Sequence, residues 1–338
     1  MPLATLSRAP RCRRPSIRGV TAVLAPLAAL AIAAPAQAAI PGPVPVPPGP
    51  PPYGERIAVE MDGRIMTMHP DGTDVRPATN PPDGVSDSAP DISADSKQVV
   101  FVRTAGGNDD VYVVNVDGSN ARRLTSTYLY DGEPTFTPDG QSVLFTSLRG
   151  IFSVEIYSMP ARPTAPEQGI VQLTRGWGYS PEVSPDGSTV VFSRDSNTYL
   201  MSIRGEAVTP AIRLTSQRGN DTDPTFSPDG SAIAFTSFRN GPCGDLYELR
   251  KTPASPTGWG TETNLTNTPA HERSPAYSPT GTQIAFSSRD CDPATSPTDI
   301  WVMGSSPNST RKKVTDTPWN ELSPSWGANS DSGPISDS

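Results

Sequence analysis

The sequence predicts an all-β fold, a six-bladed β-propeller, and three observations lead to this fold class. A Pro–x–hydrophobic step recurs at intervals of 43 to 51 residues, which is the length of one four-stranded blade. Short apolar strands alternate with turns throughout the same region, as in stacked β-sheet proteins. The repeats continue without a break, so we expect one closed ring rather than two domains. The six steps begin at Pro90, Pro134, Pro181, Pro224, Pro275 and Pro324.

Residues 1–38 have the pattern of a signal peptide. Five arginines and no acid precede a mostly apolar run over 20–34, and Ala36-Gln37-Ala38 has the small–x–small pattern of a signal-peptidase site. The run is too short and too rich in alanine for a permanent transmembrane span. We therefore expect cleavage after Ala38 and a secreted, periplasmic or cell-envelope protein. Ordinary secretion is favoured, and twin-arginine export through Arg13-Arg14 is the alternative.

The mature chain is expected to be strongly acidic. The whole chain has a formal net charge of −8, and removal of residues 1–38 leaves 22 basic against 35 acidic residues, or −13. Nucleic acids and anionic membranes require concentrated positive charge in a partner. We therefore expect no nucleic acid partner and no membrane insertion of the mature chain, and the acidity indicates solubility first.

The propeller is expected over residues 55–328, between two segments of different composition. Residues 39–54 contain eight prolines, and proline lacks a backbone donor and fixes φ, so this segment predicts an extended spacer. Residues 329–338 are rich in Ser, Asp and Gly and predict a disordered tail. We expect the protein to be a monomer.

Each repeat orders its parts in the same way. The Pro step forms a first strand, and a Ser/Thr-Pro-Asp-Gly turn follows it, as at 137–140 and 184–187. Proline presets one turn φ and glycine accepts a positive φ, so a tight hairpin is expected. A second strand then carries the motif aliphatic–x–Phe, a third contains Asp-aliphatic-aromatic, and a fourth ends in Leu-Thr. The second-strand phenylalanines are Phe101, Phe145, Phe192, Phe235 and Phe286.

The repeats are offset from the blades by one strand. The N-terminal repeat starts at the second-strand motif Ile57-Ala58-Val59, and the C-terminal step at Pro324 is a first strand with no strand after it. Joining these two parts gives six complete blades, and closure removes the exposed edges that invite aggregation. We therefore predict that the strand at Pro324 completes the blade that begins at Ile57.

This repeat resembles a known family. The pattern P-x-[FWY]-S-P-D-G, I-A-F-x-S, D-I-[YW], L-T over 57–326 is similar to the WD40-like repeats of TolB-type propellers, and related repeats occur in prolyl-oligopeptidase-type enzymes. The resemblance implies the propeller fold. TolB proteins carry an α/β domain before the propeller, whereas the proline spacer stands in that place here. The resemblance therefore does not extend to the family's role in envelope import or to its lipoprotein partner.

Charged residues recur at two positions of the repeat. An acid stands three residues before five of the six anchoring prolines, and an arginine follows five second strands. Both positions fall in loops on one face of a propeller. They could form structural ion pairs between blades, or a charged surface that holds a ligand, a cation or a partner segment. The acids are Asp87, Asp131, Asp221, Glu272 and Glu321, with Gly178 in the remaining repeat, and the arginines are Arg103, Arg149, Arg194, Arg239 and Arg289. Of the arginines, Arg149 and Arg239 are candidate binding residues together with all five acids.

Aromatic side chains gather in the same loops. Exposed aromatic residues often anchor protein or sugar partners, and they can equally pack the loops over the blades. His271 beside Glu272 could be an acid–base pair, although a lone loop histidine is more often solvated than catalytic. The further candidate binding residues are Trp177, Tyr179, Trp319, His271 and Asp223, with Tyr128 and Tyr130 near them.

Signatures of catalysis and of metal binding are missing from the sequence. There is no G-x-S-x-G elbow, HExxH, paired CxxC or P-loop. With two histidines in the chain, a channel-lining histidine set for a metal is not available. We expect no cofactor and no metal site.

Two cysteines remain after removal of the signal peptide. Cys243 and Cys291 both fall between the second and third strands of consecutive repeats, so they should lie on neighbouring blades and on one face. In an exported protein such a pair is expected to form a disulfide. Two unpaired loop thiols are the alternative.

The sequence therefore favours an exported binding scaffold over an enzyme. We expect it to engage a protein partner of the cell envelope or extracellular space through the loop-rich rim and the channel mouth. The alternative is a carbohydrate- or peptide-acting enzyme with carboxylates in the channel.

Overall fold

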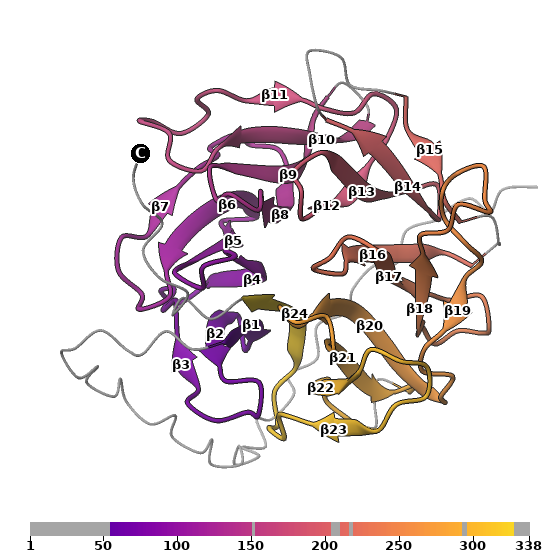
Figure 1. Ribbon diagram of the computed structural model, residues 1–338. Helices are drawn as coiled ribbons and strands as arrows, with labels where there is room; N and C mark the ends of the chain where they lie inside the picture. Colours follow the sequence, from indigo (N-terminus) through magenta and orange to yellow (C-terminus); the bar gives the residue numbers. More distant parts are fainter. Residues whose placement is uncertain (1–54, 151–152, 204–209, 216–218, 293–295, 328–338) are drawn as a thin grey trace, which may run out of the picture. The chain divides into compact units, whose positions relative to one another are not determined.

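The described part of the chain is built from β-strands alone. The computed structural model contains 24 strands in six four-stranded antiparallel sheets, which stand as blades around a ring (Figure 1). The expected signal peptide (1–38), spacer (39–54) and tail (329–338) lie outside the described residues. The structure describes residues 55–150, 153–203, 210–215, 219–292 and 296–327.

The first three blades follow the chain, with one exception at the start. Blade 1 contains β24 (Glu321–Gly327), β1 (Arg56–Met61), β2 (Arg64–Met68) and β3 (Arg76–Pro77). Blade 2 contains β4 (Val85–Ile92), β5 (Gln98–Ala105), β6 (Asn108–Asn115) and β7 (Arg122–Arg123). Blade 3 contains β8 (Asp131–Phe136), β9 (Ser142–Gly150), β10 (Ser153–Pro160) and β11 (Val171–Gln172).

The other three blades have the same order, from the inner strand outward. Blade 4 contains β12 (Tyr179–Val183), β13 (Thr189–Arg194), β14 (Asn197–Ser202) and β15 (Ile212–Arg213). Blade 5 contains β16 (Asp221–Phe226), β17 (Ala232–Ser237), β18 (Asp245–Arg250) and β19 (Thr263–Asn264). Blade 6 contains β20 (Ala270–Tyr277), β21 (Gln283–Asp290), β22 (Asp299–Gly304) and β23 (Arg311–Lys313).

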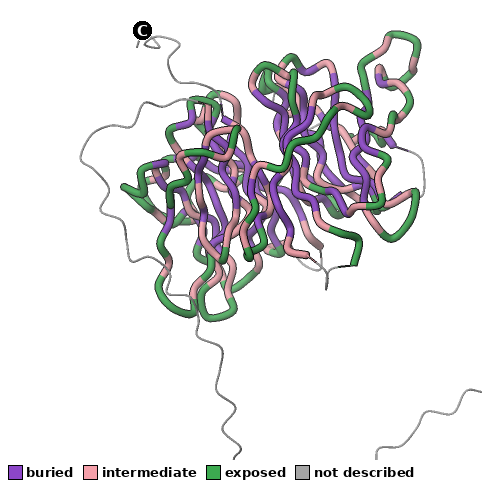
Figure 2. Tube along the Cα trace, turned by 90° about the horizontal axis from the view of Figure 1, so that it is seen from below, coloured by how far each residue is buried: buried purple, intermediate pink, exposed green. Residues whose placement is uncertain are grey.

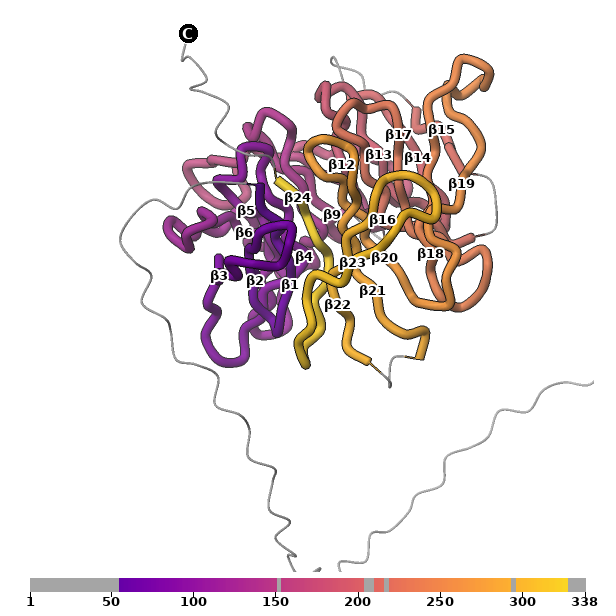
Figure 3. The backbone as a smooth tube through the Cα atoms, turned by 60° about the horizontal axis from the view of Figure 1, so that its bottom comes forward, coloured from indigo at the N-terminus to yellow at the C-terminus, as the bar shows by residue number. Residues whose placement is uncertain are grey.

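The predicted closure is confirmed. Strand β24 pairs antiparallel with β1, and Trp326 lies opposite Ile57 in the register. Figure 3 shows this last strand, in yellow, beside the indigo strands of the N-terminal blade. Each inner strand also contacts the inner strands of the two neighbouring blades, and β24 completes this series by contacting both β20 and β4. The last strand therefore closes the ring against the first blade.

The core lies between neighbouring blades. The five second-strand phenylalanines are fully buried, and each packs into a cluster shared between adjacent blades; Phe145 of blade 3, for example, meets Val100 and Val113 of blade 2. Because both faces of a blade are covered by neighbours, its strands are apolar without strict alternation, and every residue of β17 is buried. Figure 2 shows the strands mostly buried and the loops at both ends mostly exposed.

The Pro-Asp-Gly turns have the expected geometry. In the turn after β8, Gly140 has a φ of 65°, and Asp139 accepts hydrogen bonds from the backbone N of Gln141 at 3.0 Å and from Thr137 Oγ1 at 2.6 Å. The aspartate therefore closes the turn through its side chain while glycine adopts the left-handed conformation.

Every inner strand is distorted at its proline, and this feature was not expected. The residue before each of the six anchoring prolines has a positive φ, between 47° and 52°. In all six blades the register also shifts at this point, which marks a β-bulge. A following proline disfavours the right-handed helical region, and at each bulge the residue before proline adopts a left-handed φ. The six residues are Ala89, Glu133, Ser180, Asp223, Ser274 and Ser323.

Candidate binding faces and the central channel

The ring has two faces that differ in their loops. The rim face carries the loops from second to third strands and from fourth to first strands, and the turn face carries the loops from first to second and from third to fourth strands. All the rim acids and arginines of the sequence analysis belong to loops or strand ends of the rim face. The Pro-Asp-Gly turns lie on the turn face.

Three of the rim acids form ion pairs inside their own blade. Asp87 accepts hydrogen bonds from Arg103 Nε at 2.7 Å and Nη2 at 2.8 Å, and these two residues lie opposite each other in the β4–β5 register. Asp131 accepts two hydrogen bonds from Arg149 Nη2, at 2.9 and 2.8 Å, and Asp221 accepts two from Arg239 Nη2, at 3.0 and 3.2 Å. The pairs do not join neighbouring blades, as one reading of the sequence expected, because acid and arginine come from adjacent strands of one sheet.

The same arginines also stack on aromatic rings. The guanidinium of Arg149 lies 5.0 Å from the ring centroid of Phe145 and 5.3 Å from that of Tyr157, and Arg103, Arg194 and Arg239 repeat this arrangement on blades 2, 4 and 5. A planar guanidinium can pair with a carboxylate and stack at the same time. The three paired aspartates are fully buried, so they are not offered to solvent.

The other three blades depart from this pattern. Glu272 binds Arg311 and Thr268 Oγ1 rather than Arg289, and burial raises its pKa. Glu321 accepts hydrogen bonds from the hydroxyls of Thr315 and Thr317. In blade 4, where Gly178 replaces the acid, Arg194 Nε donates to the backbone O of Trp177 at 2.6 Å. Neither Glu272 nor Glu321 has any exposed surface.

The inner strands line a central channel with a cavity of about 740 Å³. Sequence reasoning placed Asp223 on the rim, but the structure places it in this channel together with carboxyl groups that were not singled out. A signal exists for four of the five channel acids, all except Glu60, because these four stand immediately before or after an anchoring proline. The channel-lining acids are Glu60, Asp91, Glu133, Glu182 and Asp223, and Arg273 is the basic residue among them.

The channel carboxyl groups connect neighbouring blades. Asp91 on β4 accepts a hydrogen bond at 2.7 Å from the backbone N of Phe136 on β8 and another at 2.7 Å from Ser325 Oγ on β24. Glu182 on β12 accepts from Thr225 Oγ1 at 2.8 Å and from the backbone N of Phe226 at 3.0 Å, both on β16, and both through Oε1. The interblade contacts expected at the rim are therefore found in the channel.

Burial makes these carboxyl groups weak acids. It raises the pKa of Glu182 to about 8, and the neighbouring charge of Asp91 acts in the same direction. Burial likewise raises the pKa values of Asp91, Glu133 and Asp223. For Asp223 this effect is opposed by Arg273 and by hydroxyl donors. Close carboxyl groups in a confined space favour the neutral form, so Glu182 is largely protonated at neutral pH.

Comparisons with known proteins agree with this geometry. Residues 73–194 match the TolB beta propeller domain family. A protein TolB homolog of Chlorobium luteolum is 31% identical over 145 residues, which cover 42% of this chain and 32% of the homologue. The crystal structure of TolB from Acinetobacter baumannii superposes with a TM-score of 0.66 and 21% identity, over 82% of this chain and 67% of that one. The fold is a six-bladed β-propeller, and residues 73–194 of it are similar to the TolB propeller domain.

The similarity has a defined extent. The chain spans about a third of the length of the curated TolB homologues that it matches. Kuenenia stuttgartiensis hydrazine synthase also contains a similar fold, with a TM-score of 0.62 and 14% identity over 81% of this chain and 47% of that one. Because one fold hosts unrelated functions, the function of this propeller has to be argued from its own surface.

His271 is buried rather than solvated. Its Nδ1 accepts a hydrogen bond from the backbone N of Gly244 at 3.1 Å, and its ring centroid lies 5.6 Å from that of Phe238. Burial lowers its pKa to about 4, and the charges of Arg289 and Arg273 add to this effect. The ring is therefore neutral at physiological pH and holds the loop before β18.

The predicted disulfide is present. Cys243, between β17 and β18, is bonded to Cys291, between β21 and β22, with their Cα atoms 5.7 Å apart. The bond therefore links blades 5 and 6 on the rim face of the propeller. Within the described residues, no group of three or more His, Cys, Asp or Glu could hold a metal ion. The same residues contain no helix that is long and apolar enough to span a membrane.

The rim face exposes large apolar side chains beside charged ones such as Asp83 and Asp316. Trp177 is 51% exposed and Trp319 is 45% exposed, whereas Tyr179 is partly buried beside the channel acids Glu133 and Asp223. Eight large apolar side chains are exposed in the described parts of the chain, and five of them lie on the rim face of the propeller. We call these five the apolar rim: Tyr128, Leu129, Leu148, Trp177 and Trp319.

Proposed function

We propose that this TolB-type propeller is an exported binding scaffold that holds a protein partner against the apolar rim and the mouth of the channel. The observation that carries the proposal is the concentration of exposed large apolar side chains on one face of an otherwise charged protein. Exposed apolar groups rimmed by polar residues are typical of protein interaction sites, and tryptophan and tyrosine are common energetic centres of such sites.

The rim charges have a different role in this proposal. Asp87, Asp131 and Asp221 are buried by their arginines, so they shape the loops that present the apolar rim instead of contacting the partner. Export is supported by the signal-peptide pattern of residues 1–38. A partner in the cell envelope is supported by the similarity to TolB homologues.

The proposal can be tested with two variants of similar exposure. Trp177→Ser replaces a side chain of the apolar rim that is 51% exposed. Val171→Ser replaces a side chain that is 56% exposed on β11, at the outer edge of blade 3. A partner is first isolated from envelope extracts and purified, and its affinity is then measured by calorimetry. Loss of a central aromatic anchor typically costs about 2 kcal/mol or more, or roughly thirtyfold in affinity.

We expect Trp177→Ser to weaken binding by at least this factor and Val171→Ser to leave it unchanged. Both variants should unfold like the wild type, because neither side chain belongs to the core. Equal affinities for the wild type and Trp177→Ser would overturn the proposal, as would equal losses for the two variants.

A second candidate function is an enzyme that acts on a carbohydrate or a peptide in the channel. The observation that favours it is the pKa of about 8 at Glu182, since a neutral carboxyl group can serve as a general acid. The hydrogen bonds of Asp91 and Glu182 to neighbouring blades support a structural role instead. Turnover of a glycan or peptide that is abolished by Glu182→Gln would establish the enzyme.

A further inference from the structure

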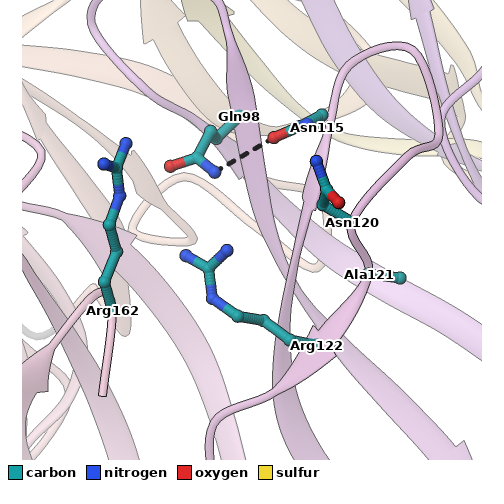
Figure 4. A pocket seen from close by; sticks show the side chains of 6 residues that line it. All are labelled: Gln98, Asn115, Asn120, Ala121, Arg122 and Arg162. Carbon is teal, nitrogen blue, oxygen red and sulfur yellow. Dashed lines mark hydrogen bonds between the residues drawn. The ribbon is translucent and has the colours of Figure 1, made fainter. Parts of the chain in front are cut away.

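A second concave site lies on the turn face, between blades 2 and 3. It has a volume of about 540 Å³ and is lined by six residues. Figure 4 shows the guanidinium groups of Arg122 and Arg162 and the side-chain amides of Gln98 and Asn120 around the same hollow. Arg122 lies on β7 of blade 2, and Arg162 follows β10 of blade 3. This site is on the opposite face from the apolar rim.

The two arginines lack a counter-charge. Within the described residues neither guanidinium forms an ion pair with a carboxylate, unlike Arg103, Arg149 and Arg239. Arg122 is partly buried, and burial lowers its pKa, with the positive charge of Arg162 as the second cause. Two adjacent like charges are destabilising unless an anion lies between or beside them.

One donor of Arg122 is also left without a partner. Its Nη2 donates to the backbone O of Ala161 at 2.8 Å, which fixes the side chain against blade 3. Its Nε is buried and has no hydrogen-bond partner. A buried unsatisfied donor of a charged group costs free energy.

The rest of the hollow is held in place by its own hydrogen bonds. Gln98 Nε2 donates to Asn115 Oδ1 at 3.1 Å. The acid of the adjacent turn, Asp117, accepts from the backbone N of Ser119 at 2.9 Å and from its Oγ at 2.6 Å. Asp117 is therefore engaged within its own turn and does not neutralise the arginines, while Asn120 and Gln98 supply neutral amides at the wall.

We propose that this hollow, lined by Arg122, Arg162, Gln98 and Asn120, is a binding site for a phosphate dianion, either inorganic phosphate or a phosphomonoester. Two uncompensated positive charges match a group that carries two negative charges better than they match a single carboxylate. Guanidinium groups also present planar, paired donors that suit the oxygens of phosphate. The site is independent of the partner that we propose for the apolar rim.

The test uses the whole exported protein and three ligands at low ionic strength. Inorganic phosphate, glycerol 3-phosphate and acetate are titrated by calorimetry at pH 8, where phosphate is largely dianionic. The variants are Arg122→Gln and Arg162→Gln, and the matched control is Arg213→Gln, an exposed arginine on the outer strand β15 of blade 4. Thermal unfolding of each variant without ligand shows whether it is folded.

We expect saturable binding of phosphate or glycerol 3-phosphate that weakens at least tenfold in Arg122→Gln and in Arg162→Gln and is retained in Arg213→Gln. The tighter of the two ligands distinguishes free phosphate from a phosphomonoester. Acetate should bind at least tenfold more weakly. Absence of phosphate binding, equal affinity for acetate, or affinity unaffected by the two pocket substitutions would each overturn the proposal.

Discussion

We expect the stability of the wild type to fall as the pH rises from 5 to 8. Replacing Glu182 by glutamine should remove much of this fall. In the folded protein its pKa is about 8, against an ordinary value of 4.5. Between these values the unfolded chain has released the proton while the folded protein still holds it. Stability therefore falls as the pH rises, because the folded state binds more protons than the unfolded state. The contribution of Glu182 is fully favourable below pH 4.5 and is lost by about pH 8.

The size of the effect follows from the interval between the two pKa values. One unit of pKa corresponds to about 1.4 kcal/mol, so the interval from 4.5 to about 8 corresponds to roughly 4 to 5 kcal/mol of lost unfolding free energy at pH 8. Glutamine stays neutral at every pH. Its Oε1 can also accept the hydrogen bonds that Glu182 Oε1 accepts from Thr225 and Phe226, so little stability should be lost at pH 5.

The assay is urea unfolding of the wild type and Glu182→Gln at pH 5, 6, 7 and 8. The variant should match the wild type at pH 5 and exceed it by several kcal/mol at pH 8. A control, Asp83→Asn, changes an exposed carboxylate and should keep the wild-type pH dependence. If Glu182→Gln follows the same curve as the wild type, or if wild-type stability does not fall over this range, the buried-acid reasoning is wrong.

Three further predictions concern the rim pairs, the disulfide and the closing strand. The double substitution Asp131→Asn and Asp221→Asn should lower stability by about 3 kcal/mol for each broken pair, while partner affinity is kept, because both acids are buried. Replacing Cys243 and Cys291 with serine releases a link across 48 residues and should cost about 4 kcal/mol in urea unfolding. Truncation after Asn320 removes β24 and should abolish the cooperative unfolding transition of the whole ring.

Each of these outcomes has a clear contrary result. If the folded double-asparagine variant loses partner affinity, the rim acids belong to the surface that binds the partner. Unchanged stability without the disulfide would show that blades 5 and 6 are fixed by packing alone. An unchanged melting profile after truncation would contradict closure by the last strand, although β24 is the direct neighbour of β1 in the sheet.

The rim residues illustrate how far the sequence could lead toward a site. Their spacing from the anchoring prolines placed Asp87 and Trp177 on one face, and the structure places both there. Their exposure differs completely, because Asp87 is buried by Arg103 and Trp177 is 51% exposed. Spacing in a repeat determines the face on which a residue lies, but it does not determine which neighbouring side chain covers it.

The channel shows the same limit in another form. Glu133 and Glu182 stand directly beside anchoring prolines, so their positions were visible in the sequence. Their interactions were not visible, because they depend on the bulge at each Pro, where the preceding residue has a positive φ. There each acid accepts a hydrogen bond from a backbone N on the next blade. Arg122 and Arg162 likewise meet only because two blades stack side by side.

The sequence by itself determined the number of blades, the order of strands within each blade, the closure by β24 and the disulfide between Cys243 and Cys291. These features depend on local patterns that repeat at a fixed period, so they can be counted along the chain. Only the tertiary structure decided which charges are buried, where carboxyl groups approach one another and which arginines remain unpaired. Those properties depend on contacts between side chains of neighbouring strands and blades. The residues that meet in this way often come from different repeats, so the pattern of one repeat does not show which of them touch.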